Sequence, residues 1–209
     1  MENLKKSMTI VFLVGFIISA TSAFSQDYTA IQTAFSNSYT NETKGEYQKA
    51  VEELKKVYDE KSYEINLRLG WLTYMSGLFT ESIAYYQKAV AILPYSIEAK
   101  FGLTYPAAAL GNWMQVQTQY EEVLKIDPNN TTANYKIGNL YYGKKDYTKA
   151  FGHFEKVVNL YPFDYDSVII FAWTNFKLGK LREAKVLFNK ALMMRPNDAS
   201  ATEGLGLIK

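Results

Sequence analysis

The chain has 209 residues, of which 48% are apolar and 21% charged, and its formal net charge at pH 7 is +2. That length fits one ordinary domain or one solenoid, and the charge shows no basic excess of the kind that favours nucleic-acid binding. The sequence contains no cysteine. This excludes disulfides, a thiolate nucleophile and a zinc–thiolate site.

The start of the chain, at 1–25, has the three parts of a secretory signal peptide. Lys5 and Lys6 form a basic start, an apolar stretch follows at 8–20, and small residues at 21–23 or 23–25 offer a cleavage site. The apolar stretch is interrupted by Gly15 and is shorter than the roughly 20 residues of a spanning helix. We therefore expect an exported protein, periplasmic or associated with the cell envelope. It would meet a membrane only through this segment, if the segment stayed uncleaved as an anchor.

The rest of the chain repeats at a constant interval, which the prolines show most clearly. They recur at Pro94, Pro128, Pro162 and Pro196. Eight residues before each of them is an aromatic residue: Tyr86, Tyr120, Phe154 and Phe188. Glycines recur before predicted turns at Gly77, Gly111 and Gly179. One such unit cannot bury its apolar face alone, so the period predicts stacked units.

The clearest unit, 131–162, reads as two helices joined by the turn Gly143-Lys144-Lys145-Asp146. On one face of its first helix lie Asn134, Ile137, Gly138 and Tyr141. One stripe of its second helix holds Ala150, Phe154 and Val157. This pattern resembles the tetratricopeptide repeat (TPR), which combines Leu-Gly, a Tyr, Ala-x-x-x-Phe and a final Pro in one unit. Asn134 stands where the family usually has Trp.

The resemblance, to TPR proteins of the exported bacterial type, implies an all-α fold: a right-handed solenoid of antiparallel helix pairs, the TPR superhelix. The predicted segments are a signal peptide at 1–25, a degenerate N-terminal repeat at 27–62, repeats at 63–96, 97–130, 131–164 and 165–198, and a C-terminal capping helix at 199–209. The last segment is interpreted as a lid on the final repeat. The alternative is an incomplete unit that exposes Leu207 and Ile208.

The unit 97–130 departs most from the pattern. Thr104 and Val116 stand where small Gly and Ala are expected, and Pro106 falls inside the first helix. A helix-interior Pro removes one backbone hydrogen bond, here to the carbonyl of Gly102. We expect a kink at Pro106, with the missing side chain of Gly102 easing the bend.

No catalytic or metal-binding pattern is present, so we expect neither an enzyme, nor a cofactor, nor a metal site. The single histidine, His153, has Gly152 and Phe154 as neighbours rather than a nucleophile loop. There is no phosphate-binding loop. The adjacent pairs Glu52-Glu53 and Glu121-Glu122 point about 100° apart on a helix, so neither pair can share a proton.

In TPR proteins similar to this one, the first helix of each repeat lines a concave groove. The resemblance therefore implies a binding surface on one stripe of each first helix. Its candidate ligand-binding residues are Leu67, Trp71, Tyr74, Phe101, Tyr105, Tyr135, Asn139, Tyr142, Ile169, Trp173 and Phe176.

A structural role is the alternative for two of these residues, because Tyr135 and Tyr142 can pack between adjacent first helices. Trp71, Tyr105 and Trp173 instead occupy a place where a polar residue such as Asn139 is usual, which favours a role in binding. A clamp for a C-terminal carboxylate is not expected. Its Lys, Arg and Asn positions are met only by Lys136, Arg68 and Asn139.

The sequence thus predicts a non-enzymatic scaffold or adaptor that binds a peptide segment or protein partner in an aromatic groove, in the cell envelope. No nucleic-acid partner is expected. Two alternatives remain open: a binding module for a glycan or lipid, and an accessory subunit of an envelope enzyme or secretion complex.

Overall fold

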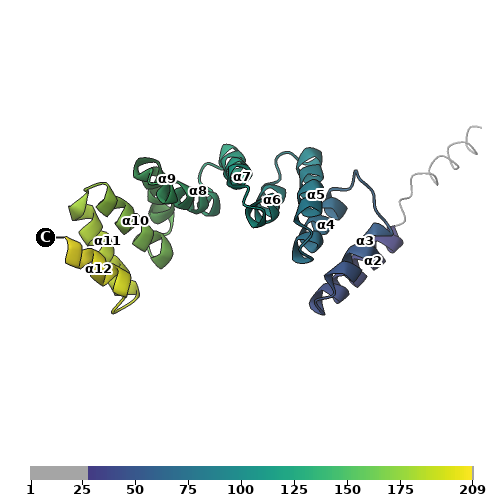
Figure 1. The fold of residues 1–209 in the computed structure, drawn as a ribbon, viewed down its shortest axis with the longest axis horizontal. Coiled ribbons are helices and arrows are strands. Elements are labelled where there is room, and N and C mark those ends of the chain that lie inside the picture. The colour runs from purple at the N-terminus through teal and green to yellow at the C-terminus, as the bar shows by residue number, and fades with distance from the viewer. Residues whose placement is uncertain (1–27, 209) are drawn as a thin grey trace, which may run out of the picture. The chain divides into compact units, whose positions relative to one another are not determined.

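The computed structural model describes residues 28–208, which form eleven α-helices and no strand (Figure 1). The predicted signal peptide lies outside these residues. The helices are α2 (Tyr28–Thr43), α3 (Tyr47–Lys55), α4 (Tyr63–Met75), α5 (Phe79–Ile92), α6 (Ile97–Ala109), α7 (Trp113–Ile126), α8 (Thr131–Gly143), α9 (Tyr147–Leu160), α10 (Tyr165–Lys177), α11 (Leu181–Met194) and α12 (Ala199–Leu207). Within the described residues, no helix is both long and apolar enough to cross a membrane. The all-α solenoid of helix pairs that the resemblance implies is confirmed.

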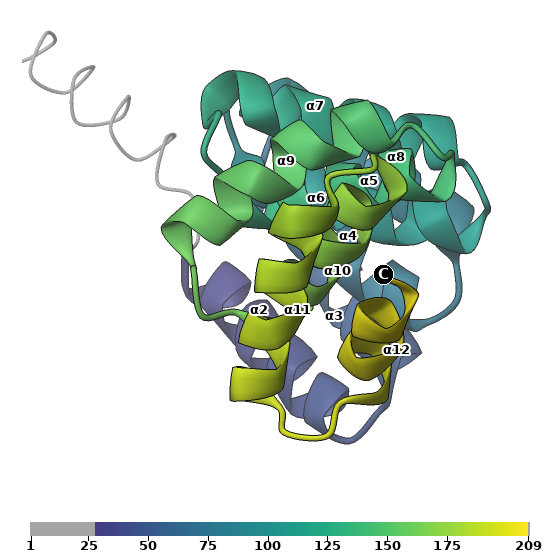
Figure 2. The ribbon, with the colours of Figure 1, turned by 90° about the vertical axis from the view of Figure 1, so that its left-hand side faces the viewer.

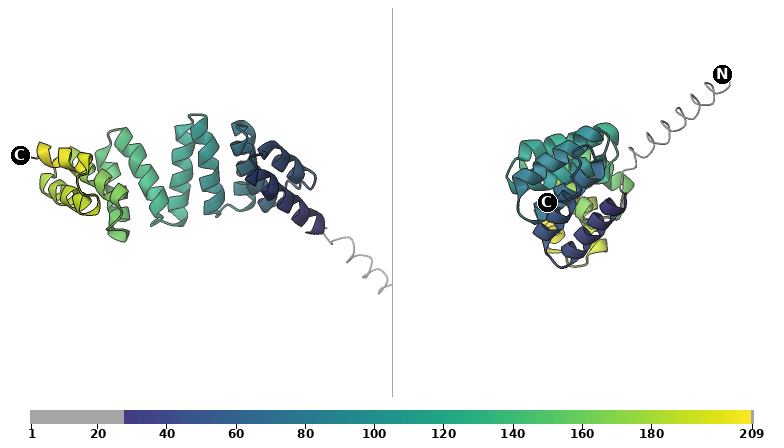
Figure 3. Two further views of the ribbon diagram at one scale, coloured as in Figure 1. Left: turned by 90° about the horizontal axis from the view of Figure 1, so that it is seen from below. Right: turned by 90° about the vertical axis from the view of Figure 1, so that its right-hand side faces the viewer.

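The helices fall into two compact units. The first contains α2 and α3, which bury Ala34 and Leu54 and are joined by a hydrogen bond of 3.1 Å from Asn37 Nδ2 to Glu53 Oε2. The second begins at Lys61 and contains α4 to α12, in which the pairs α4–α5, α6–α7, α8–α9 and α10–α11 follow one another (Figure 3).

Each first helix of the second unit starts at a polar side chain that caps it. The capping oxygen accepts a hydrogen bond of 2.8–3.3 Å from the backbone N–H three residues further on. The caps recur with the period of the sequence: Ser62, Ser96, Asn130, Asp164 and Asp198. Because each cap satisfies an otherwise unpaired donor, it fixes where a repeat begins.

The turns within the repeats share one left-handed residue. Gly77, Gly111 and Gly179 have φ values of 77°, 72° and 74°, and the equivalent residue of the third turn is Lys145, with φ 62°. Gly143, which the sequence placed in this turn, is instead the last residue of α8. A non-glycine residue therefore holds the left-handed conformation in this one repeat, at a steric cost.

Bulky rings of the second helices fit against glycines of the first helices. Tyr86 on α5 is 3% exposed. It lies between Gly70 on α4 and Gly102 on α6, where an added Cβ would come within 2.9 Å and 2.6 Å of ring atoms. Phe154 on α9 fits against Gly138 on α8 in the same way. These close approaches explain the Gly–aromatic spacing of the sequence.

Helix α6 keeps its helical backbone through Pro106, which is buried. The interpretation of Gly102 as a residue that eases a bend is not supported. It faces the ring of Tyr86, and any side chain there would overlap that ring.

Helix α12 packs against α11 and α10 (Figure 2). Ala201 is fully buried, and Gly204 lies against the ring of Phe188 in the position that Gly102 has against Tyr86. Leu207 on the outer side remains 51% exposed. The helix thus covers the core of the last repeat with one face and exposes an apolar residue on the other.

Candidate functional site

A hollow of about 650 Å³ lies in the second unit, where α4, α6, α7 and α8 meet. Small or polar side chains form part of its wall, among them Thr104, Ala108, Lys136 and Asn139. The rest of the wall is mainly aromatic, with rings from Tyr74, Phe101, Tyr105, Trp113 and Tyr120. We call this space the aromatic hollow. It brings together, from three successive first helices, four residues that the sequence placed in a groove: Tyr74, Phe101, Tyr105 and Asn139.

The rings of α4 and α6 pack on one another along the wall of the hollow. The centroids of Trp71 and Tyr74 are 5.9 Å apart, those of Tyr74 and Tyr105 are 5.7 Å apart, and those of Trp71 and Tyr105 are 6.4 Å apart. Tyr105 is 51% exposed. Mutual packing holds these rings in place and leaves a tyrosine face open to solvent.

The hollow lies where one ring of the repeat pattern is missing. In two other repeats, a tyrosine near the end of the first helix packs on the ring that starts the second helix: Tyr74 on Phe79 at 5.7 Å, and Tyr142 on Tyr147 at 5.2 Å. The equivalent of Tyr74 in the repeat of α6 is Ala108. Trp113, which starts α7, therefore lacks the ring that would cover it and remains 56% exposed.

Polar groups for a ligand come from α8. Lys136 is the only charged residue among the described residues that line the hollow, and it has no ion-pair partner in the described part of the chain. The Asn139 amide donates to the carbonyl of Tyr135 at 2.8 Å, which leaves its oxygen as an acceptor. The hollow thus presents apolar faces, one cation and one amide oxygen.

A smaller hollow of about 340 Å³ adjoins the first at Thr132, which lines both. Its wall includes Tyr135 and Tyr161 together with Asp164 and Asp166. We call it the acidic hollow. Its only charged lining residues, within 28–208, are the two aspartates.

Three models of the family described as tetratricopeptide repeat match residues 42–97, 132–164 and 165–198. The chain belongs to the tetratricopeptide repeat family. The matched ranges leave residues 98–131 between them, so the aromatic hollow lies around the TPR unit that departs most from the pattern.

Solved structures with this fold include other TPR proteins. The chain is 21% identical to a tetratricopeptide repeat protein from Parabacteroides merdae, with a TM-score of 0.72 over 85% of this chain and 71% of that one. It is 23% identical to MamA, with a TM-score of 0.69 over 79% and 91% of the two chains. It is 15% identical to YrrB, described as a TPR protein with an unusual peptide-binding site, with a TM-score of 0.68 over 90% and 97%. At these identities the likeness shows the fold alone.

Among curated proteins, the chain is similar to the human protein O-mannosyl-transferase TMTC1. They are 24% identical over 152 residues, which are 70% of this chain and 17% of that protein. The chain therefore spans less than a fifth of the length of this relative.

Trp173 does not belong to the aromatic hollow. Its ring packs on Phe188 with centroids 5.0 Å apart, and its Nε1–H donates to Ser200 Oγ at 2.8 Å. This ring therefore packs on α11 and α12, and the role in binding that the sequence favours for it stays a prediction. Ile169 and Phe176 also pack against the C-terminal core rather than lining the aromatic hollow.

The two tyrosines with a structural alternative do make structural contacts. Tyr135 packs on Phe154 with centroids 6.1 Å apart, although it also lines the acidic hollow, and Tyr142 packs on Tyr147. Leu67 is half-buried and lines neither hollow. Trp113 was not among the residues predicted from the sequence. The 34-residue period could have identified it, since it places Trp113 at the position of Phe79 and Ala108 at the position of Tyr74.

His153 has a structural environment. Asn134 donates its amide hydrogens to the carbonyls of Pro128 and Asn130, at 3.1 and 2.9 Å, so its oxygen accepts from His153 Nδ1 at 2.9 Å. The imidazole also stacks on Tyr141, with centroids 5.7 Å apart. Burial lowers the pKa of His153 below its ordinary value, and a nearby lysine adds to the effect. Asn134, in the place of the usual TPR tryptophan, thus holds the histidine.

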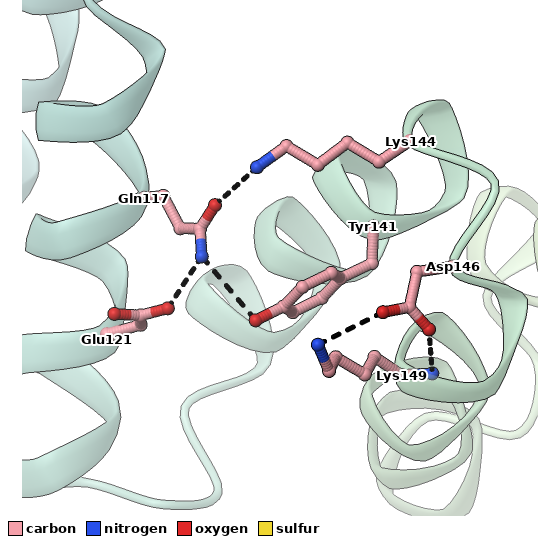
Figure 4. Close-up of polar contacts among 6 residues, drawn as sticks. All are labelled: Gln117, Glu121, Tyr141, Lys144, Asp146 and Lys149. Carbon is pink, nitrogen blue, oxygen red and sulfur yellow. Dashed lines mark hydrogen bonds and ion pairs between the residues drawn. The ribbon is translucent and has the colours of Figure 1, made fainter.

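A polar network next to this histidine joins α7 to α8 (Figure 4). Gln117 Nε2 donates to Glu121 at 2.7 Å and to the hydroxyl of Tyr141 at 3.4 Å, and Lys144 donates to Gln117 Oε1 at 2.7 Å. Lys149, which pairs with the helix cap before it, lies over the Tyr141 ring at 5.1 Å. These contacts connect repeats. In residues 28–208 no group of His, Asp and Glu has the arrangement of a metal site.

Proposed function

We propose that this protein is a non-enzymatic scaffold that holds an extended peptide segment of a protein partner in the aromatic hollow. TPR repeats support the role of a protein-interaction scaffold. The observation that supports peptide binding in the aromatic hollow is the exposure of aromatic rings on its wall. Tyr105 and Trp113 are each more than half exposed at the rim of a space of about 650 Å³.

The chemistry of the hollow favours a bulky apolar anchor on the peptide. Aromatic side chains that are already fixed by packing supply contact area with little loss of conformational entropy, so they make strong contact sites. Lys136 and the Asn139 oxygen lie where the peptide backbone of the partner would find one donor for a carbonyl and one acceptor for an N–H. The description of YrrB as a TPR protein with a peptide-binding site agrees with this choice of ligand class.

The test is selection from a displayed library of random peptides against residues 28–209, followed by affinity measurements on the enriched peptides. Ala108→Tyr restores the ring that Tyr74 and Tyr142 supply in other repeats, so it fills the hollow. Tyr105→Ala removes an exposed wall. Each variant should weaken binding by at least about 2 kcal/mol, the scale of a hot spot.

The matched control is Ala91→Tyr, which adds the same ring to an exposed position on α5. It should leave the affinity unchanged. Peptides that bind all three variants as they bind the wild type would place the binding surface elsewhere. If no peptide is enriched, but a glycan binds the wild type and no longer binds the Ala108→Tyr variant, the hollow is a sugar site.

We propose the cell envelope as the place of action, on the strength of the basic start, apolar stretch and small residues at 1–25. The mature protein from its native host should then lack the residues up to Ala23 or Ser25. Intact-mass measurement decides this, and a mass that still includes residues 1–24 contradicts cleavage.

A further inference from the structure

The acidic hollow has a lining unlike that of its neighbour. Tyr135 and Tyr161 contribute rings, while Asp164 and Asp166 contribute carboxylates. Tyr161 is more than half exposed. Aromatic faces attract cations, and here they stand beside two negative charges with no cation among the described lining residues.

Both aspartates keep binding capacity. Asp164 accepts the backbone N–H of Ser167 with one oxygen at 3.0 Å as the cap of α10, and its other oxygen has no partner in the described part of the chain. Asp166 has Arg195 as an ion-pair partner at 3.6 Å, with both side chains more than half exposed. The Arg195 guanidinium also lies over the Tyr165 ring, 3.5 Å from its centroid. An exposed ion pair contributes little to stability, so Asp166 can also pair with a ligand cation.

The two hollows share Thr132, so one extended ligand can reach both. Their charges are opposite, because Lys136 lines the aromatic hollow and the aspartates line the acidic one. A basic residue in the ligand is therefore repelled from the first hollow and attracted to the second. A peptide with one apolar and one basic residue would therefore place them in different hollows.

We propose that the acidic hollow is a subsite for a basic side chain of the same peptide whose apolar anchor fills the aromatic hollow. Arginine fits better than lysine, because its planar guanidinium stacks on tyrosine while also pairing with carboxylates. The proposal rests on the proposed function and adds the charge pattern of the partner: a bulky apolar residue followed or preceded closely by an arginine.

The experiment uses peptides enriched by residues 28–209 in the display selection. In the enriched peptide, arginine is replaced by citrulline, which keeps the shape and removes the charge. In the protein, Asp164→Asn with Asp166→Asn removes both charges, and asparagine still caps α10. We expect about a fivefold loss of affinity from either change. Made together, the two changes should cost little more than one alone.

The matched control is Glu183→Gln with Glu203→Gln, which removes the same net charge from exposed positions on α11 and α12. It should leave the affinity for the arginine peptide unchanged. An equal loss in the control would mean that only net charge matters, and the subsite would be wrong.

Different outcomes would overturn the acidic subsite and the proposed function. Enriched peptides with an apolar anchor but no basic residue, blocked by Ala108→Tyr, would overturn the acidic subsite and leave the proposed function standing. Peptides indifferent to Ala108→Tyr would overturn both. If replacing arginine by citrulline weakens binding equally for the wild type and for the double Asn variant, the arginine binds outside the acidic hollow.

Discussion

Gly102→Ala should destabilise the protein although alanine is the better helix former. Gly102 lies inside α6 and faces the ring of Tyr86. An added methyl would overlap Cε1 of that ring and lie 2.6 Å from Cζ. The ring has little room to move away, because it also lies close to Gly70 of α4, with ring atoms 2.9 Å from where a Cβ would stand there.

Two opposing terms set the size of the effect. Overpacking a buried site costs about 1–3 kcal/mol, whereas replacing glycine by alanine within a helix gains about 0.5–1 kcal/mol. The net loss for Gly102→Ala should be about 1–2 kcal/mol. Gly152→Ala on α9 is the matched control, because a Cβ there meets no atom within 4 Å. It should stabilise the protein by the helix term alone, about 0.5–1 kcal/mol.

The assay is urea unfolding followed by circular dichroism, with both variants compared with the wild type. Tyr86→Leu shortens the opposing side chain, so the double variant with Gly102→Ala should lose less stability than the sum of the two single changes. If Gly102→Ala is as stable as Gly152→Ala, the ring can shift. The close packing of α5 on α6 is then not what requires glycine at this position.

Four further variants test other contacts by the same unfolding assay. Lys145→Gly should stabilise the protein by about 0.5–1 kcal/mol by relieving a left-handed backbone, and no gain would mean that the lysine conformation is unstrained. Pro106→Ala should raise the free energy of unfolding by about 0.5–1 kcal/mol. Removing proline from a helix interior gains about 3 kcal/mol, which exceeds the cost of the lost burial of the proline ring and of the added freedom of the unfolded chain. A lower stability would show that burial of the ring matters more. Because the pKa of His153 is lower in the folded protein than in the unfolded chain, the unfolded chain takes up the proton at a higher pH. The contribution of His153 to stability is therefore fully present above its ordinary pKa of 6.5 and is lost as the pH falls below that value. His153→Gln, which removes the sole histidine, should reduce the stability lost between about pH 7.5 and 5.5, and an unchanged loss would assign it to other groups. Trp173→Phe should cost about 1–2 kcal/mol through the lost bond to Ser200, and lost peptide binding at full stability would make it a groove residue instead.

The repeat architecture could be predicted because it depends on local chemistry that recurs in every unit of the sequence. The capping residues, the turn glycines and the Gly–aromatic pairs each act within one helix pair or its direct neighbour. The turn at Lys145 shows the limit of this reasoning. A glycine two residues earlier looked like the turn residue, but the backbone keeps the period and places the lysine in the left-handed conformation.

Only part of the wall of the aromatic hollow could be predicted from the sequence, because the role of each ring depends on its neighbours rather than on its residue type. Trp71, Tyr105 and Trp173 share one position of the repeat, yet only the first two have rings beside them on the wall of the hollow. Trp173 has Ser200 on α12 as a partner, which a single repeat does not contain. The role of a ring therefore depends on what the next helix presents to it.

The least regular repeat has both the weakest family pattern and the wider of the two hollows, and one cause explains both. Thr104 and Ala108 on α6 line the aromatic hollow, and Ala108 stands where two other repeats have the ring of a tyrosine. The rings of Tyr86 and Phe154, in the repeats on either side, are buried and closely packed. In a solenoid, whose stability is nearly a sum over neighbours, one loosely filled unit is tolerable between two well-packed ones. Departures from the local pattern are expected where a surface serves binding rather than packing. The absence of a ring at position 108 is therefore better evidence for a ligand than the presence of rings elsewhere in the chain.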